Sequence, residues 1–211
     1  MASNTLIKFF EGEIEGDIML SEFLTTTFVD VRSARRTDEL HDAILSELLD
    51  KYPRYKKYKW EFEYNLKGDA FGGAFKVDIL GFKNGLPKVA ILCKCNNSNI
   101  GKNIYNFTNT TIGESARLMY SEYKFEKILF VSVYPRKAPL FKKDGSIRSF
   151  DTPYTYKERV NSSRILHEQY GNIVEEVNIF YDIENLESKK SREDFYKIIP
   201  KNITEIELKY E

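Results

Sequence analysis

The feature that most constrains this 211-residue chain is a pair of neighbouring strand patterns joined by a tight-turn signal. Apolar and polar residues alternate from Phe75 onward, as they do along a strand with one buried face. Asn84-Gly85 follows, a dipeptide that readily adopts the positive φ angles of a two-residue hairpin turn. A second strand pattern runs from Lys88 to Cys95. We therefore expect the chain to fold back on itself as a β-hairpin.

Two charged residues interrupt these apolar patterns. Asp78 lies in the first strand pattern and Lys94 lies in the second, where the alternation allows both to share one face of the hairpin. An ionised group is costly to bury unless it is paired or binds a metal. A structural ion pair between Asp78 and Lys94 is one explanation of this pattern, and a functional site is the other.

The hairpin resembles the core of the PD-(D/E)XK nucleases, a family that includes restriction endonucleases and Holliday-junction resolvases. Asp78 matches the Asp of the family motif and Lys94 matches its Lys, while Gly72-Gly73 precede the Asp strand. The chain departs from the motif at Leu92, which stands in place of the acid of Glu-x-Lys and cannot bind a metal. The resemblance implies an α/β fold with a restriction-endonuclease-like core, in which helices flank a central mixed β-sheet.

The resemblance also implies a catalytic Mg²⁺ or Mn²⁺ ion. Asp78 and the backbone carbonyl of Cys93 are its expected ligands, since hard divalent cations bind carboxylate and carbonyl oxygens. Two acids are candidates for the missing ligand: Glu39, on a helix before the first strand, and Glu114, on the helix after the lysine strand. Lys94 is expected to orient or help to deprotonate the attacking water and to stabilise the developing negative charge.

The surrounding patterns extend the expected order of elements. Thr37 is a good N-cap for a helix that should end at Tyr52-Pro53, and the alternation from Lys59 to Leu66 predicts a first strand. The later patterns predict helices at about 103–121, 161–170 and 191–198 and strands at about 127–133, 177–181 and 203–210. The resulting order of elements matches the family core over about residues 37–134. We expect one domain of residues 1–211, in which an N-terminal arm (1–36) precedes this core and a C-terminal extension (135–211) follows it.

Polar and basic residues around the carboxyl ends of the predicted strands are candidates for contacts with DNA. Asparagine can bond base edges, and lysine and arginine commonly contact phosphates, although all three are also ordinary loop and surface residues. The 32 basic residues balance 32 acidic ones, so attraction to DNA would depend on local clustering rather than on net charge. The candidates are Asn97, Asn99, Lys102, Asn103, Asn106, Arg117, Arg136 and Lys137.

The function expected from the resemblance is that of a metal-dependent endonuclease that hydrolyses phosphodiester bonds in double-stranded DNA, as type II restriction enzymes do. A homodimer is expected because both strands of a duplex must be cut. The alternative is a nuclease fold that lost its chemistry at Leu92 and binds DNA or a protein partner. A small-molecule α/β enzyme is disfavoured, because the sequence has no Gly-rich phosphate loop and no Gly-x-Ser-x-Gly motif.

The remaining composition predicts a cytoplasmic protein with no membrane segment. No apolar run is long enough to cross a bilayer, and no signal-peptide pattern follows Met1. Cys93 and Cys95 lie two apart on one strand face, which is poor geometry for a disulfide, so we expect reduced core residues. His41 and His167 are far apart in the sequence, so no Cys/His cluster predicts a zinc site.

Overall fold

The structure is a computed structural model, and it describes residues 35–68, 70–152, 157–197 and 200–206. Short 3₁₀ helices are present at Pro53–Lys57, Ile100–Lys102, Leu186–Ser188 and Glu193–Lys197. The longer elements are α3 (Arg35–Lys51), β1 (Lys59–Lys67), β2 (Ala74–Lys83), β3 (Leu86–Cys95), α4 (Ile104–Met119), β4 (Lys127–Pro135), β5 (Ala138–Phe141), β6 (Ile147–Asp151), α5 (Lys157–Tyr170), β7 (Val174–Ile183) and β8 (Pro200–Ile206).

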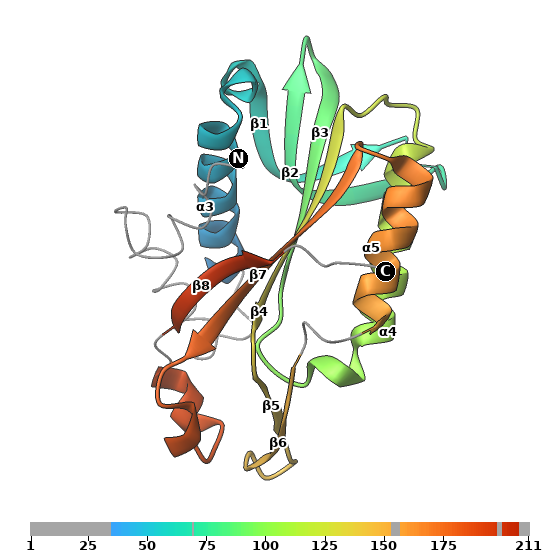
Figure 1. Ribbon diagram of the computed structural model, residues 1–211. Helices are drawn as coiled ribbons and strands as arrows, with labels where there is room; N and C mark the ends of the chain where they lie inside the picture. The colour runs from blue at the N-terminus through green and yellow to red at the C-terminus, as the bar shows by residue number, and fades with distance from the viewer. Residues whose placement is uncertain (1–34, 69, 153–156, 198–199, 207–211) are drawn as a thin grey trace.

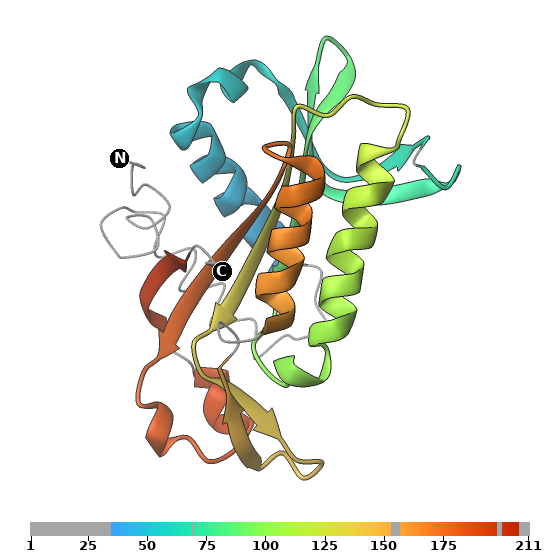
Figure 2. The same ribbon diagram turned by 45° about the vertical axis from the view of Figure 1, so that its right-hand side comes forward.

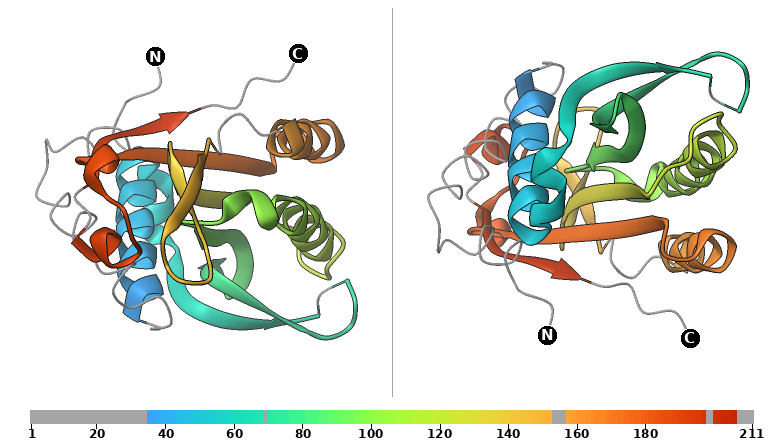
Figure 3. Two further views of the ribbon diagram at one scale, coloured as in Figure 1. Left: turned by 90° about the horizontal axis from the view of Figure 1, so that it is seen from below. Right: turned by 90° about the horizontal axis from the view of Figure 1, so that it is seen from above.

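A six-stranded mixed sheet forms the centre of the described part of the chain, with the strand order β1-β2-β3-β4-β7-β8. Strand β2 pairs antiparallel with both β1 and β3. Strand β4 pairs parallel with β3 and with β7, and β8 pairs antiparallel with β7 at the far edge. Helix α3 covers one face of the sheet, and α4 and α5 cover the other (Figures 1 and 3). The predicted α/β class, a mixed sheet flanked by helices, is confirmed.

The hairpin expected from the sequence joins β2 to β3. Asn84 has a φ of 53° and Gly85 a φ of 76°, which are the left-handed conformations that this turn requires. The β2–β3 ladder runs from the turn only as far as the pair of Ile79 and Ile91. Strand β3 nevertheless stays paired with β4 as far as Cys95. The two strands therefore separate beside Asp78, and we call this point the fork.

The alternation predicted for the Asp78 strand is broken at the fork. Val77 belongs to the apolar cluster beneath α4 and α5, whereas Ile79 belongs to the cluster beneath α3, although the sequence pattern placed both on one face. The neighbouring strand shows the reason. Between the pairs Phe62–Ile79 and Tyr64–Val77, Glu63 has a left-handed φ of 52°, which locally turns the strands.

Helix α3 forms because apolar residues recur at helical spacing on its inner face. Leu40, Ile44 and Leu48 are buried against the sheet in the α3-side cluster. The helix ends at Lys51, immediately before Tyr52-Pro53, as predicted. Its start was predicted wrongly, since it begins at Arg35 and Thr37 is therefore inside the helix rather than at its N-cap.

Helices α4 and α5 lie side by side over the other sheet face (Figure 2). Strand β4, between the two helical layers, is buried along almost its whole length, as its uninterrupted apolar sequence predicts. The chain beyond residue 134 continues this sheet through β7 and β8 instead of forming a separate unit. Strands β5 and β6 form a separate short hairpin, which Lys142 to Ser146 connect.

Two predictions concern residues outside the described part of the chain. The expected N-terminal arm lies there except for its last two residues, and so do residues 207–210 of the last predicted strand. Within the described residues, no helix combines the length and the apolar character needed to cross a membrane.

Candidate active site

The side chain of Asp78 fills the gap that opens where β2 leaves β3. Its Oδ2 accepts a hydrogen bond of 2.7 Å from the backbone N–H of Cys93, which lies beyond the last pair of the β2–β3 ladder. The N–H and C=O of one residue in an extended strand point to the same side. The Cys93 carbonyl is therefore directed to the same side of β3 as its N–H, the side on which β2 lies.

The environment of Asp78 opposes ionisation. Burial raises the pKa of its carboxyl above the ordinary value, and the charge of Glu63 adds to this increase. The Cys93 amide, His41 and Lys94 act in the opposite direction and lower the pKa, because they stabilise the carboxylate. Asp78 is thus a half-buried acid held near positive charge, which is the environment of a carboxylate that can bind a cation.

Lys94 and Glu114 meet across the sheet face covered by α4. The Nζ of Lys94 lies 3.4 Å from the Oε1 of Glu114, and the two side chains are 28% and 15% exposed. Burial raises the pKa of Glu114, Lys94 opposes this increase, and the negative charge of Asp78 adds to it. The second carboxylate oxygen of Glu114, Oε2, is buried without a hydrogen-bond partner. Lys94 of β3 and Glu114 of α4 therefore form a pair whose charges act on Asp78, while the Asp78 carboxylate itself lies within 4.8 Å of ligand atoms of His41 and Cys93.

Mg²⁺ and Mn²⁺ prefer oxygen ligands. The oxygen donors among these residues are the Asp78 carboxylate and the Cys93 carbonyl at the fork, and the unpartnered Oε2 of Glu114 beside Lys94. Leu92 is 2% exposed within the α4-side cluster and supplies no ligand. The side chain of Glu39, the other candidate for the missing acid, lies outside the described part of the structure.

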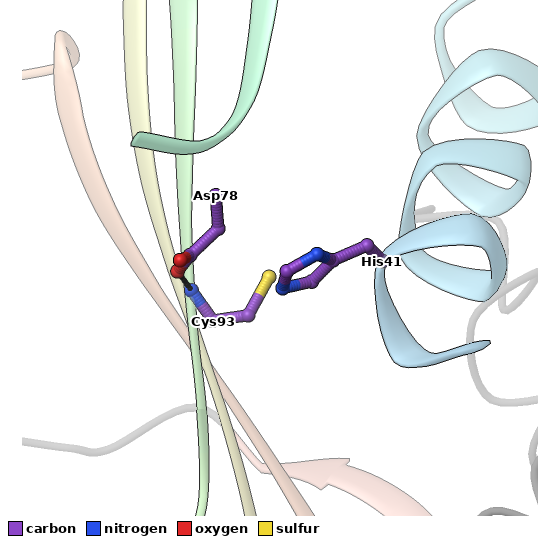
Figure 4. A group of neighbouring side chains, drawn as sticks. All are labelled: His41, Asp78 and Cys93. Carbon is purple, nitrogen blue, oxygen red and sulfur yellow. Dashed lines mark hydrogen bonds between the residues drawn. The ribbon is translucent and has the colours of Figure 1, made fainter. Parts of the chain in front are cut away.

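Two further residues at the fork were not predicted as site residues. His41 of α3 faces Cys93 and Asp78, and one ligand atom from each of the three lies within 4.8 Å of the others (Figure 4). Glu63 of β1 lies beside this group, with its Oε1 3.6 Å from the Nδ1 of His41, and it also pairs with Lys76. The expectation that histidine and cysteine do not cluster in this chain is wrong for His41 and Cys93.

The sequence does contain a signal for His41. It precedes Ile44 by three positions and Leu48 by seven, so it shares their inward helical face. The side chain is 1% exposed in the structure, and its ring stacks on Phe62 with centroids 6.3 Å apart. A histidine at a core position of a helix therefore marked the contact between α3 and the sheet, although the pattern does not show which strands it meets.

The asparagines predicted to contact DNA differ in their accessibility. The Oδ1 of Asn97 accepts a hydrogen bond of 3.0 Å from the Tyr181 hydroxyl, and the Oδ1 of Asn99 accepts one of 3.1 Å from the backbone N–H of Phe141. These two oxygens hold the loop that follows β3. The exposed side chains of Asn103 and Asn106 are at the start of α4, and Asn103 forms no capping hydrogen bond through its side chain.

The basic candidates lie in two places. The Arg117 guanidinium lies over the rings of Phe71 and Phe75, one turn of α4 beyond Glu114, whose pKa it lowers. At the carboxyl end of β4, Arg136 is 3.7 Å from Asp182 and Lys137 is 3.7 Å from Glu187. The Lys102 side chain is not among the described residues.

No protein-family model, curated protein or solved structure matches this chain. Its chemistry is therefore inferred from the side chains gathered at the fork, which are carboxylates, a lysine, a histidine and a thiol.

Proposed function

We propose that this protein is a metal-dependent endonuclease of the PD-(D/E)XK type that hydrolyses phosphodiester bonds in double-stranded DNA. The observation that carries this proposal is the position of Glu114. Its carboxylate lies beside Lys94, with a buried oxygen left unpartnered, and thus supplies the acid that Leu92 does not. Asp78, Lys94 and Glu114 then make up the acid, lysine and second acid that the chemistry needs.

The arrangement of elements supports the same proposal. A helix is followed by three antiparallel strands, a second helix and a strand parallel to the third, and this is the order of the PD-(D/E)XK core. Asp78 and Lys94 stand on the second and third of these strands, as the family motif requires. The fork between the two strands leaves Asp78 free of the β2–β3 ladder.

Each residue has a distinct role in the proposed reaction. Asp78, the Cys93 carbonyl and Glu114 would hold Mg²⁺ or Mn²⁺, which when bound polarises the scissile phosphate and lowers the pKa of a water molecule. Lys94 orients the attacking water through its ammonium group and stabilises the negative charge that develops on the phosphate. Its ion pair with Glu114 places Nζ beside the second acid.

The test is cleavage of supercoiled plasmid and linear phage DNA with Mg²⁺ or Mn²⁺. The wild-type protein is compared with Lys94→Ala, Glu114→Gln and Lys88→Ala. Lys88 provides the matched control, because it is a lysine of the same strand whose amino group bonds the Lys124 carbonyl, six positions before Lys94. We expect cleavage by the wild type and Lys88→Ala, and a loss of at least roughly 100-fold in the other two variants.

Folded wild-type protein that cuts no DNA with either metal would contradict the proposal. Cleavage that survives Lys94→Ala unchanged would also contradict it, because the activity would then come from other residues or from a contaminant. Size-exclusion chromatography with light scattering tests the accompanying proposal that the active form is a homodimer on duplex DNA.

A second candidate function is supported by Leu92. This side chain is 2% exposed and packed in the apolar cluster with Leu118 and Phe130, so the position of the family acid has become part of the core. A nuclease fold that only binds DNA or a protein partner is consistent with that packing. This candidate predicts DNA binding that is unchanged in Lys94→Ala, together with no cleavage by the wild type.

A further inference from the structure

We infer that the α3 side of the fork is a binding site for a divalent transition metal such as Zn²⁺, with His41, Asp78 and Cys93 as its protein ligands. The three residues come from α3, β2 and β3, so the ion would join the helix to the two separating strands (Figure 4). This inference does not depend on the proposed nuclease activity.

The separations of the donor atoms are close to those of a metal site. One ligand atom from each of the three residues lies within 4.8 Å of the other two. Donors in a tetrahedral site with Zn–S and Zn–N bonds are roughly 3.5 Å apart, so each pair needs to converge by about 1.3 Å at most. Side-chain rotation alone supplies a movement of this size, because each donor is at the end of its side chain.

His41 is held at the core with one ring nitrogen in need of a partner. The side chain is 1% exposed, and its Nδ1, the nitrogen nearest Glu63, is buried without a hydrogen-bond partner. Leaving a buried polar group unsatisfied costs about 1–3 kcal/mol, so such groups call for a partner. Stacking on Phe62, with an interplanar angle of 6°, holds the ring in this orientation.

Glu63 is placed to orient the histidine. Its Oε1 is 3.6 Å from the Nδ1 of His41, which is slightly too long for a hydrogen bond. A small movement of the carboxylate would let it accept a hydrogen bond from Nδ1–H, which leaves Nε2 as the metal ligand. Carboxylate partners of this kind set the tautomer and orientation of histidines that bind metals. Glu63 is therefore a positioning residue in this inference.

The donor set selects a different class of metal from Mg²⁺. A thiolate, an imidazole and a carboxylate suit Zn²⁺, Co²⁺ or Fe²⁺, whereas Mg²⁺ requires oxygen ligands. Three protein ligands leave one tetrahedral position for water. Burial, followed by the charge of Asp78, raises the pKa of the Cys93 thiol well above its ordinary value.

Asp78 is the one side chain that the transition-metal site shares with the proposed nuclease site. Lys94 and Glu114 meet on the face beneath α4, whereas Cys93 and His41 belong with the apolar cluster beneath α3. A substitution of Lys94 therefore separates the two sites, because it removes cleavage without touching a ligand of the transition metal.

The test is titration of the metal-free protein with Co²⁺, followed by its absorption spectrum. A thiolate ligand gives a charge-transfer band in the near ultraviolet, and tetrahedral Co²⁺ gives strong visible bands. The variants are Cys93→Ser, His41→Gln, Glu63→Gln and Lys94→Ala, with Cys95→Ser as the matched control. Cys95 is the other cysteine of the chain and lies on the same strand, two residues beyond Cys93.

The expected result is a thiolate band in the wild type, Lys94→Ala and Cys95→Ser that is absent from Cys93→Ser. His41→Gln should bind Co²⁺ and Zn²⁺ at least roughly 100-fold more weakly, and Glu63→Gln roughly 10- to 100-fold more weakly. Circular dichroism of each metal-free variant confirms folding. His41→Gln provides the deciding measurement by calorimetry with Zn²⁺ if Cys93→Ser does not fold.

Three results would overturn the inference. The first is a folded wild-type protein that shows no thiolate band and no saturable Zn²⁺ binding. The second is a band that persists in Cys93→Ser or disappears in Cys95→Ser. The third is Zn²⁺ affinity that is the same in His41→Gln as in the wild type.

Discussion

Asp78 and Glu114 are carboxyl groups whose burial at the fork raises their pKa values above the ordinary 3.8 and 4.5. At a pH between the ordinary and the raised pKa values, the native protein therefore holds protons that the unfolded chain releases. The free energy of unfolding contributed by these groups is greatest below the ordinary pKa and falls as the pH rises through the raised native values. At neutral pH the ionised carboxyl groups therefore lower the free energy of unfolding, and binding of the proposed cation would offset this loss.

The first prediction at the residue scale concerns Glu114→Gln. The amide keeps the shape of the side chain and removes the charge, while Lys94, which is 28% exposed, can still be hydrated. In EDTA at pH 8 we expect the variant to be more stable than the wild type by roughly 1 kcal/mol, the scale of a single substitution. At pH 4 the difference should disappear, because the wild-type carboxyl is then protonated.

Urea unfolding at the two pH values measures this difference. Glu168→Gln is the control, since Glu168 is a half-exposed residue of α5 that pairs with Arg164 on the surface, and its loss should change stability only slightly. The prediction fails if Glu114→Gln is stabilised equally at pH 4 and pH 8, or is destabilised at pH 8. Either result would show that the ionised Glu114 carboxylate does not lower the free energy of unfolding.

At the scale of elements, β1 and β2 are held together by a close contact between Gly81 and Trp60, which are directly paired. A Cβ atom at Gly81 would lie 2.7 Å from the indole ring. The ring cannot easily retreat, because its Nε1 donates a hydrogen bond of 3.2 Å to the Tyr55 carbonyl and the ring stacks on Tyr58. The glycine is therefore required by its neighbour rather than by its own backbone conformation.

Gly81→Ala should accordingly destabilise the protein by roughly 1–3 kcal/mol, the usual cost of overpacking. Gly113→Ala is the opposite case: Gly113 is inside α4, and a Cβ atom added to it would meet no described neighbour within 4 Å. Removing a helical glycine there should stabilise the protein by about 0.5–1 kcal/mol. Thermal unfolding distinguishes the two, and a Gly81→Ala protein as stable as the wild type would mean that the Trp60 ring moves aside freely.

Elements with strong local signals were predictable from the sequence. The hairpin follows from Asn84-Gly85, the end of α3 from Pro53, and β4 from an uninterrupted apolar run. The pair β5 and β6 was missed, because each strand has only four or five residues and β6 is mostly exposed, so neither shows a clear alternation. The left-handed Glu63 was also missed, since its conformation depends on the neighbouring strand and not on its own type.

The candidate site was predictable only in part, for a related reason. Asp78 and Lys94 were visible because a charge inside an apolar strand pattern is conspicuous in the sequence. His41 was not, because the docking of α3 on the sheet is a tertiary contact that helical periodicity does not specify. Glu114 was one of two candidates for the missing acid. Its carboxylate lies beside Lys94, whereas the side chain of Glu39 is outside the described part of the structure.

At the scale of the whole molecule, the sheet order brings together residues that are distant in sequence. Strand β3 has antiparallel β2 on one side and parallel β4 on the other, and the connection to β4 passes through α4 on one face while α3 packs on the opposite face. The proposed oxygen site with Glu114 of α4 and the proposed thiolate site with His41 of α3 both use the Asp78 carboxylate, so the two metals should compete.

This competition gives a prediction for the intact protein. Zn²⁺ added to the Mg²⁺-dependent cleavage reaction should inhibit it, and excess Mg²⁺ should relieve the inhibition. Cys93→Ser should keep cleavage activity but need at least roughly 10-fold more Zn²⁺ for half inhibition, because a thiolate ligand is lost. Cys95→Ser should behave as the wild type. Equal inhibition of the two serine variants would place the inhibitory ion elsewhere.

The separation of β2 from β3 has one more consequence, for the backbone of Cys93. Its N–H is held on that side by a carboxylate rather than by a neighbouring strand. The NMR chemical shift of the Cys93 amide should therefore report the state of Asp78. It should change when the carboxylate gains a proton or binds a metal ion. The fold thus contains its own spectroscopic reporter, located in the main chain at the point where the strands part.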